Sequence, residues 1–279
     1  MATSHPPVIL ITGCSSGLGR SIATEALSRG LRVIATARRL EAVSDLDKKG
    51  AKTLALDITA AQADLEKFAA KAIALFGRVD ILVNNAGYYQ FGAVEETSPE
   101  QMQSQFATNF FGVVNLTNAF LPHFRERKAG FIANIGSQSS YGPFPGAGVY
   151  GASKAAVDYI SQVWAKELKE FNIRTVSIGP GLFRTSAATN MKFQSKELPC
   201  YEGLHKQRDM YLAYSGHEPG DPKKAAVKIL DLVTSDKDLP GRLPIGDDAV
   251  ALLDQTMQAE AKEFQAWKEF GKGTNHDQA

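Results

Sequence analysis

Short apolar segments alternate with longer segments of helical periodicity along most of this chain, and this alternation restricts the fold more than any other feature. The apolar segments are short, mostly rich in β-branched residues and mostly followed by Gly, Asn or Asp, which is typical of buried strands. They are Val8–Thr12, Arg32–Thr36, Thr53–Leu56, Ile81–Val83, Phe131–Ile135 and Arg174–Ile178. Helical spacing is found in Leu18–Arg29, Ala61–Phe76, Pro99–Arg127 and Ser153–Phe171. The sequence therefore predicts an α/β protein in which right-handed crossovers build a parallel sheet with helices on both faces.

Composition narrows the class of protein further. The chain has 279 residues, 44% of them hydrophobic and 22% charged, so it can bury a full core under a polar surface. A net charge of +1 gives no electrostatic reason to expect nucleic acid or a membrane as partner, and no apolar run approaches the roughly 20 residues of a membrane span. The N-terminal residues do not resemble a signal peptide, so a cytoplasmic location is the default expectation. Neither the two cysteines, Cys14 and Cys200, nor the five histidines have metal-ligand spacing, so we expect no metal.

The strand–helix rhythm changes after the sixth apolar segment. Residues 182–222 show no clean pattern, whereas Pro222–Thr234 and Ala249–Phe270 have helical spacing and Leu243–Ile245 fits a last strand. A long irregular stretch is usually a binding loop, or else a pair of helices that the pattern does not reveal. We expect a substrate lid there, because ligands of such sheets bind outside the carboxyl ends of the strands. The chain is then a single domain over 1–279, with a core at 8–181, a lid at 182–222 and a helical part at 223–279.

The first strand runs directly into a glycine-rich turn, TGCSSGLG at Thr12–Gly19, and then into a helix. Glycines at 13, 17 and 19 let the backbone turn tightly and approach a pyrophosphate, whose charge meets the amides of the helix N-terminus. Glycine also serves ordinary turns, but its position between the first strand and the first helix favours a dinucleotide site.

The end of the second strand bears on the choice of dinucleotide. An NAD site wants an acidic side chain there for the ribose hydroxyl, and this chain has Ala37, Arg38 and Arg39. A guanidinium can pair with the 2′-phosphate of NADP(H), which is therefore the expected cofactor. The alternative is that both arginines are simply solvated surface residues. Asp57, at the end of the third strand, is placed either to cap a turn or to contact the adenine.

Tyr150 and Lys154 lie at i and i+4, on one face at the start of a predicted helix. The ordinary phenol pKa is about 10, and a cation at this spacing favours the phenolate, so the pair can exchange a proton with a carbonyl or an alcohol. Ser137, which follows the fifth strand, can hydrogen-bond the same substrate oxygen. Asn109 is predicted in mid-helix, where it could hold a water chain to Lys154 or be an ordinary polar residue.

Together these motifs resemble the short-chain dehydrogenase/reductase family in its common form. The match consists of TGxxxGxG at 12–19, NNAG at 84–87, Asn109, Ser137, the Tyr150–Lys154 pair and PGxxxT at 180–185, in order over about two thirds of the chain. The resemblance implies a Rossmann-like, doubly wound parallel sheet. It also implies a homodimer or homotetramer formed through the long helices.

The resemblance assigns a role to each matching residue. Tyr150 is the implied acid/base and Ser137 polarises the substrate oxygen, while Lys154 holds the nicotinamide ribose and lowers the tyrosine pKa. Asn109 anchors a proton-relay water, Asp57 meets the adenine and Asn84 a ribose. The residues expected at the cofactor are Ile11, Gly13, Ser15, Ser16, Gly17, Leu18, Gly19, Arg38, Arg39, Asp57, Ile58, Asn84, Ala86, Gly87, Tyr150, Lys154, Pro180, Gly181, Phe183 and Thr185.

The side chains expected around the substrate are largely aromatic, which suits a hydrophobic or polycyclic molecule. They are Tyr88, Tyr89, Phe91, Ser137, Tyr141, Phe144, Tyr150 and Phe183. Several of these rings could instead simply pack the lid against the sheet. The sequence resembles family members that act on steroids, retinoids and fungal secondary metabolites, so we expect a bulky ketone, aldehyde or alcohol and an NADP(H)-dependent oxidoreductase. One alternative is a nucleotide-binding protein without redox turnover, in which the set Asn109, Ser137, Tyr150 and Lys154 would be incomplete. Another is a methyltransferase, which the Tyr150–Lys154 pair and the two arginines disfavour.

Overall fold

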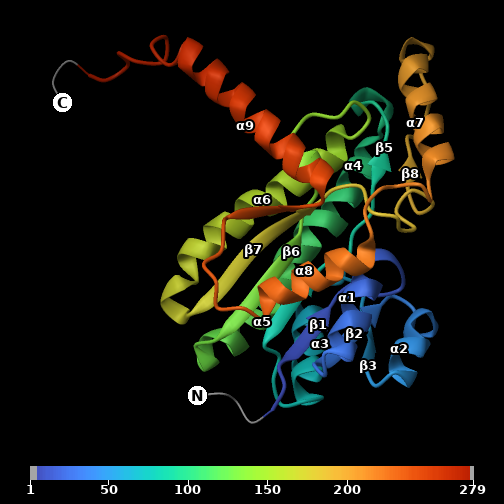
Figure 1. Ribbon diagram of the computed structural model, residues 1–279, viewed down its shortest axis with the longest axis vertical. Coiled ribbons are helices and arrows are strands. Elements are labelled where there is room, and N and C mark those ends of the chain that lie inside the picture. The colour runs from blue at the N-terminus through green and yellow to red at the C-terminus, as the bar shows by residue number, and fades with distance from the viewer. Residues whose placement is uncertain (1–4, 277–279) are drawn as a thin grey trace.

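A computed structural model describes residues 5–276 and contains a seven-stranded sheet in the order β3-β2-β1-β4-β6-β7-β9 (Figure 1). All neighbouring strands are parallel. The strands are β1 (Val8–Ile11), β2 (Arg32–Ala37), β3 (Lys52–Ala55), β4 (Ile81–Asn84), β6 (Gly130–Ile135), β7 (Ile173–Pro180) and β9 (Arg242–Ile245). The chain order reverses between β1 and β4, which is the doubly wound arrangement that the sequence predicted.

Helices cover both faces of the sheet, and the strands are apolar throughout because both of their faces are buried. On β1, Ile9 and Ile11 belong to one hydrophobic cluster whereas Val8 and Leu10 belong to the other, as the alternation of side chains along a strand requires. The first cluster lies under α1 (Gly17–Ser28) and α8 (Pro222–Val233). The second lies under α3 (Gln62–Ala74), α5 (Gly112–Arg127) and α6 (Gly148–Glu167).

Two predicted helices differ from the expectation in ways that affect the site. The helix expected from Ser153 begins at Gly148, so that Tyr150 lies within its first turn. The helix expected over Pro99–Arg127 consists of α4 (Pro99–Phe106), a π-helical turn at Ala107–Phe111, and α5. Glycine has a low helix propensity, which hid the true start of α6, and apolar periodicity does not reveal a single wide turn.

Some short elements escaped the sequence pattern. A 3₁₀ turn and the helix α2 (Ser44–Lys48) follow β2, and a small separate sheet pairs β5 (Gln90–Phe91) with β8 (Lys192–Phe193). Residues 182–222 contain the helix α7 (Glu202–Tyr214), so the hidden-helix alternative holds for that part. Among the α7 residues only His205 is buried, and a helix that buries so little has no clear apolar stripe to detect.

The last helix, α9 (Asp247–Trp267), starts against the end of the sheet and then projects away from the body (Figure 1). All residues from Met257 to His276 are exposed. Within the described part of the chain, no helix combines the length and the apolar character needed to cross a membrane.

Candidate functional site

The glycine-rich turn forms a narrow space between the end of β1 and the start of α1. Gly13 and Gly17 have φ values of +71° and +59°, which side-chain-bearing residues rarely adopt. A Cβ on Gly19 would lie 2.3 Å from the Asn85 Nδ2 atom and 2.7 Å from the Gly13 carbonyl oxygen. The Ser16 side chain makes no capping hydrogen bond, so it does not occupy the amides at the start of α1. Only glycines can form this turn, which we call the glycine cradle, and the free amides at the start of α1 suit a diphosphate between strand and helix.

Neighbouring segments hold this turn in place. The Thr12 hydroxyl accepts hydrogen bonds from the Asn85 and Ala86 amides, both at 2.9 Å. The Asn85 side chain donates to the Thr12 carbonyl at 2.7 Å. A Cβ on Gly17 would lie 3.5 Å from the Thr185 Cβ atom, so the loop after β7 lies against the turn. Sequence analysis missed Asn85, although its place in NNAG, next to Asn84, was a signal.

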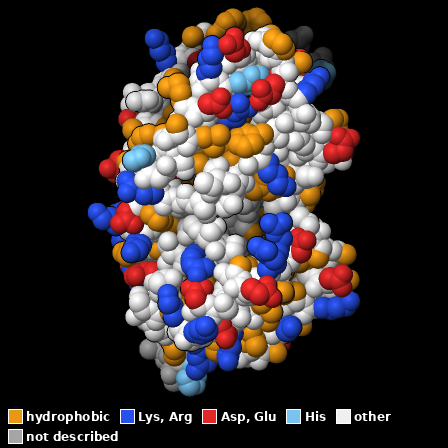
Figure 2. Space-filling model, turned by 90° about the vertical axis from the view of Figure 1, so that its right-hand side faces the viewer, with side chains coloured by type: hydrophobic (Ala, Val, Ile, Leu, Met, Phe, Trp, Pro, Cys, Tyr) orange, Lys and Arg blue, Asp and Glu red, His pale blue; other side chains and the backbone are white. Residues whose placement is uncertain are grey.

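The residues expected near the adenine lie at the ends of β2 and β3. Arg38 and Arg39 are exposed. The Asp57 carboxylate accepts hydrogen bonds from the Thr59 amide at 2.9 Å and the Thr59 hydroxyl at 2.7 Å, so its turn-capping role is realised. These bonds from Thr59, together with the charge of Arg38, lower the pKa of Asp57. Figure 2 shows the molecule from this side, hollowed at mid-height with Lys and Arg side chains along the lower rim.

The Asn84 side chain lies inside the protein. It donates to the Thr117 hydroxyl at 2.9 Å and to Asn134 Oδ1 at 2.8 Å. The amide therefore joins β4 to α5 and β6 inside the protein, which argues against a ribose contact through this side chain.

The four residues expected in catalysis meet near the carboxyl ends of β4 and β6. Lys154 Nζ donates to the Ile135 carbonyl at 2.7 Å. The Ser137 hydroxyl lies close enough to the Tyr150 phenol to lower its pKa. A Cβ on Gly87 would lie 3.0 Å from Asn109 Oδ1 and 3.5 Å from Lys154 Nζ, so the NNAG segment closes this group.

Asn109 lies in the π-helical turn and is fully buried. Its side chain accepts from the Tyr88 amide at 3.1 Å and donates to the Tyr88 carbonyl at 3.0 Å and to the Ser153 hydroxyl at 3.2 Å. Wide turns of this kind often mark functional positions, since they leave a backbone carbonyl without its regular partner.

Burial controls the proton affinities in this group. It lowers the pKa of Lys154 to about 8, against the opposing charge of Asp158. Burial also raises the pKa of Tyr150, and the nearby Ser137 hydroxyl only partly offsets this. Lys154 is not among the groups that shift the Tyr150 pKa in this structure, so the expectation that it lowers the tyrosine pKa stays a prediction.

Asp158, one turn after Lys154 on α6, is a buried site residue that sequence analysis missed. Its carboxylate accepts hydrogen bonds from the Ser140 hydroxyl at 2.5 Å and from the Ser177 hydroxyl. Burial raises the pKa of Asp158, while the bonds from Ser140 and Ser177 oppose the rise. The carboxylate thus fastens α6, which carries Tyr150 and Lys154, to the loop after β6, which carries Ser137, and to β7.

Aromatic side chains surround the Tyr150 phenol, as expected. The Tyr89 ring meets the Tyr150 ring edge to face, with centroids 4.5 Å apart, and Phe91 lies 6.3 Å from Tyr89 in the same manner. The Lys192 ammonium lies 4.2 Å from the centre of the Tyr88 ring. Tyr211 of α7 lies close enough to raise the pKa of Tyr150, a contribution that sequence analysis missed because α7 was not predicted.

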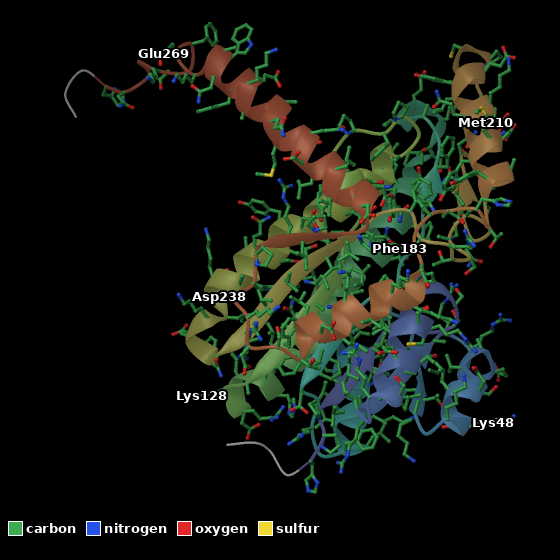
Figure 3. The ribbon with its side chains drawn as sticks, viewed as in Figure 1. Lys48, Lys128, Phe183, Met210, Asp238 and Glu269 are labelled. Atoms are coloured by element: carbon green, nitrogen blue, oxygen red, sulfur yellow. The ribbon has the colours of Figure 1, made fainter. Side chains whose placement is uncertain are left out.

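Three aromatic residues expected in the pocket lie elsewhere. The Phe183 ring packs over Gly220 and Gly246 against the α1–α8 cluster (Figure 3). Tyr141 is buried between Gly179 and the Arg242 guanidinium, which lies 5.4 Å from its ring centre.

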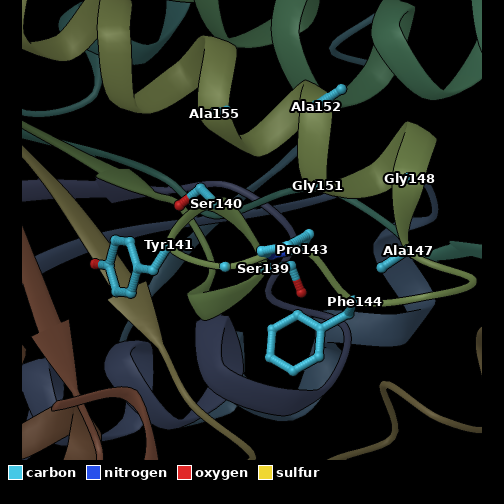
Figure 4. A pocket seen from close by; sticks show the side chains of 11 residues that line it. Ser139, Ser140, Tyr141, Pro143, Phe144, Ala147, Gly148, Gly151, Ala152 and Ala155 are labelled. Atoms are coloured by element: carbon cyan, nitrogen blue, oxygen red, sulfur yellow. The ribbon is translucent and has the colours of Figure 1, made fainter. Parts of the chain in front are cut away.

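Phe144, the third of them, is 40% exposed in an outer groove of about 310 Å³. Neither Ser137 nor Tyr150 lines this groove, and Figure 4 shows the Tyr141 and Phe144 rings pointing in different directions. Aromatic character alone did not reveal which way each ring would point.

Comparisons with known proteins agree with this geometry. The family model described as short chain dehydrogenase matches residues 7–196. An uncharacterized oxidoreductase of Schizosaccharomyces pombe is 35% identical over 92% of this chain and 88% of its own length. The oxidoreductase BOA17 of Botryotinia fuckeliana is 34% identical over 93% and 96%. Human retinol dehydrogenase 8 is 34% identical over 81% and 78%.

Solved structures are similar over most of the chain. A short-chain dehydrogenase from Streptomyces avermitilis superposes with a TM-score of 0.89 at 37% identity, covering 98% of this chain and 100% of that one. A serine dehydrogenase complexed with NADP⁺ has a TM-score of 0.74 at 29% identity, with coverages of 85% and 94%. A 3-ketoacyl-(acyl-carrier-protein) reductase from Brucella melitensis complexed with NADH has a TM-score of 0.73 at 25% identity, with coverages of 87% and 98%.

Proposed function

The chain belongs to the short-chain dehydrogenase family, and from this premise we propose that it is an NADP(H)-dependent oxidoreductase that interconverts a bulky hydrophobic ketone or aldehyde with its alcohol. The observation that carries the proposal is the meeting of the Tyr150 phenol with Ser137, Lys154 and Asn109 beside the glycine-rich turn. When bound, the nicotinamide supplies or accepts the hydride.

The protein groups handle the proton. A raised pKa keeps the Tyr150 phenol protonated at neutral pH, so it can donate to a carbonyl oxygen during reduction. Ser137 donates a hydrogen bond to the same oxygen as negative charge develops on it. Lys154, with its pKa near 8, can pass a proton onward at near-neutral pH, because transfer is easiest when the pKa lies close to the working pH. The π-helical turn around Asn109 is suited to hold the water that completes the relay.

The cofactor proposal rests on two regions, the glycine-rich turn and the end of β2. The turn at 12–19, with Thr185 against it, would hold the diphosphate, and Lys154, beside Gly87, would hold the nicotinamide ribose. At the other end, Arg38 is exposed at the end of β2 and offers its guanidinium to a 2′-phosphate. One relative structure holds NADP⁺ and another NADH, so family membership alone leaves this choice to the residues.

The substrate proposal rests on the rings around Tyr150. Tyr88, Tyr89, Phe91 and the Tyr211 ring of α7 provide an aromatic wall with few polar groups, which suits a large apolar molecule. We propose that residues 182–222, including α7, act as the lid over this wall. Similarity to retinol dehydrogenase 8 supports a substrate of this size and polarity.

The decisive test is the substitution Tyr150→Phe. We expect turnover of NADPH with a panel of bulky ketones and aldehydes to fall by roughly 10²–10⁴-fold, because the proton donor is lost. NADPH binding, measured by fluorescence titration, should stay nearly constant. Tyr89→Phe is the matched control, since it removes a neighbouring phenol and keeps the ring. Full activity in the Tyr150→Phe protein would refute the mechanism, and NADPH binding by the wild-type protein without turnover on any panel member would favour a non-redox role.

A second test addresses the cofactor. In the Arg38→Asp protein a carboxylate replaces the guanidinium, so we expect the dissociation constant for NADPH to rise by about 10–100-fold, the loss of one charge-assisted contact. That for NADH should change little. Glu41→Gln, another exposed substitution after β2, serves as control. Equal effects of Arg38→Asp on both cofactors would show that the arginine is only a surface residue.

A further inference from the structure

The extended segment Tyr88–Phe91 carries the aromatic rings that reach Tyr150. The Tyr89 ring meets the Tyr150 ring with centroids 4.5 Å apart, and the Phe91 ring lies 6.3 Å from that of Tyr89. Side chains alternate along an extended chain, so both rings stay on the side of Tyr150 as long as the backbone that carries them is held in place. The position of this backbone therefore decides how much room a substrate has beside the phenol.

One edge of this segment has no strand beside it. In the described chain the strand β5 is paired with β8 alone, and the Lys192 amide, on β8, donates to the Tyr89 carbonyl at 2.9 Å (Figure 1). On the opposite edge, backbone groups of Tyr88 and Gln90 are hydrogen-bonded to side chains. Buried backbone groups need partners, so these side chains take the place of a missing strand.

Gln105, in α4, supplies most of this substitute edge. Its side chain is fully buried, with Oε1 accepting from the Gln90 amide at 2.9 Å and Nε2 donating to the Tyr88 carbonyl at 3.0 Å. A primary amide offers an acceptor and a donor side by side, as the edge of a strand does. One side chain thus bridges the residues before and after Tyr89, whereas Asn109 holds Tyr88 alone within the segment.

The far end of the segment is joined to the loop that leads into α6. The Gly92 amide donates to the Gly146 carbonyl at 3.0 Å, and a Cβ on Gly146 would lie 2.5 Å from the Phe91 ring. The segment is therefore held between α4, which carries Gln105, and α6, which carries Tyr150. The bonds made by Gln105 are then part of what fixes the distance between the rings and the phenol.

We propose that Gln105 is a positioning residue that determines how well a large substrate fits beside Tyr150. Its amide group holds the backbone of Tyr88–Phe91, and with it the Tyr89 and Phe91 rings, at a fixed depth in the site. This role rests on the proposed function, in which these rings form the substrate wall. Gln105 acts through the segment rather than by touching the substrate, because its side chain is fully buried and both of its polar atoms bind backbone groups.

Steady-state kinetics of the Gln105→Met protein test this role. Methionine has a similar volume but makes neither bond, so we expect the KM for 1-decalone, a bicyclic ketone, to rise about tenfold, the effect of one lost hydrogen bond. The KM for 2-butanone and the kcat for both ketones should change little, since a small ketone needs only Tyr150 and Ser137. Gln103→Met, the same substitution at an exposed position of α4, is the control. An unchanged KM for 1-decalone, or an equal rise for both ketones, would overturn the proposal.

The Thr117→Val substitution separates positioning from a general loss of stability. It removes a buried acceptor of the Asn84 side chain and leaves the segment Tyr88–Phe91 untouched. We expect it to lower the free energy of unfolding, as Gln105→Met does, without a rise in the KM for 1-decalone. A comparable rise in both proteins would show that any weakening of the core has this effect, and it would refute a specific role of Gln105.

Hydrogen exchange tests the placement of the segment without any substrate. Because the Gln90 amide is bonded to Gln105, exchange in a peptide covering 88–92 should be faster in the Gln105→Met protein and unchanged in the Gln103→Met protein. Exchange that stays slow in the Gln105→Met protein would overturn the proposal. Faster exchange, combined with a wild-type protein that turns over no ketone or aldehyde of the panel, would refute the proposed function and not the placement of the segment by Gln105.

Discussion

Asp158 shows how a single buried carboxylate can hold the elements of a site together. It holds Ser140 and Ser177 by hydrogen bonds and stands one helical turn from Lys154. Its charge raises the pKa of Lys154, opposing the larger effect of burial. It is therefore a positioning residue that also sets the proton affinity of the lysine.

We expect the Asp158→Asn substitution to shift the pH profile of turnover. Without the carboxylate charge the pKa of Lys154 falls further below 8, so the alkaline limb that depends on its ammonium form should move to lower pH. The free energy of unfolding should fall by about 1–3 kcal/mol, because the two serine donors lose an ionised acceptor.

A pH–rate profile and a denaturant titration of the Asp158→Asn protein check these effects. Glu167→Gln, exposed at the other end of the same helix, should change neither. A loss of stability with no movement of the alkaline limb would show that Asp158 has only a structural role.

Residues whose partners are close in sequence could be predicted, and the others could not. Tyr150 and Lys154 share a helical face at fixed spacing, and Ser137 follows a recognisable strand. The partners of Asp158 lie 18 and 19 positions away along the chain, so no local pattern announces it. The directions of the Phe183 and Tyr141 rings could not be predicted, because ring direction depends on packing, which the alternation of elements does not specify.

At the scale of elements, α7 is fixed to the body by a small polar cluster. Glu96, fully buried after β5, accepts hydrogen bonds from the Ala93 amide at 3.2 Å and the Leu198 amide at 2.7 Å. The same carboxylate lies 2.8 Å from Nε2 of His205, the buried residue of α7. Exposed Glu197 also faces this histidine, at 3.7 Å. These polar contacts hold α7 against the body, because the helix has no apolar stripe that could do so.

We expect Glu96→Gln to loosen α7. The amide group of glutamine cannot accept from all the donors that surround the carboxylate, so trypsin should cut faster at Lys196 and Lys206 and the KM for substrate should rise. Limited proteolysis and steady-state kinetics measure the two effects. Glu202→Gln, on the exposed side of α7, is the control. Unchanged cleavage and KM would mean that other contacts hold the helix.

The same substitution should alter the response to acid. Burial would raise the pKa of Glu96, but the hydrogen bonds from Leu198, His205 and Ala93 together hold it below its ordinary value of 4.5. The stabilisation is therefore full above about pH 5 and is lost as the pH falls through the lowered pKa. Thermal unfolding followed from pH 6 downward should show a smaller loss of stability in the Glu96→Gln protein than in the wild type.

At the scale of the whole molecule, the sheet could be predicted because each strand carries its own signal and the crossover rule fixes how strands are joined. The positions of α7 and α9 could not be predicted, because these exposed helices bury few side chains against the sheet. No buried apolar stripe therefore indicates where they lie. The sequence pattern identified α9 as amphipathic, but only the structure shows that its apolar side has no cover within the described chain.

One contact at the base of α9 has a mechanical consequence. Asp248 accepts a hydrogen bond of 2.7 Å from the Leu182 amide, in the loop that carries Thr185 over the glycine turn. The beginning of this helix, which is about 31 Å long, is therefore joined to that loop. A force on the exposed end of α9 would therefore reach the glycine-rich turn through the hydrogen bond between Asp248 and Leu182. A partner bound to that end would also restrain the loop that carries Thr185.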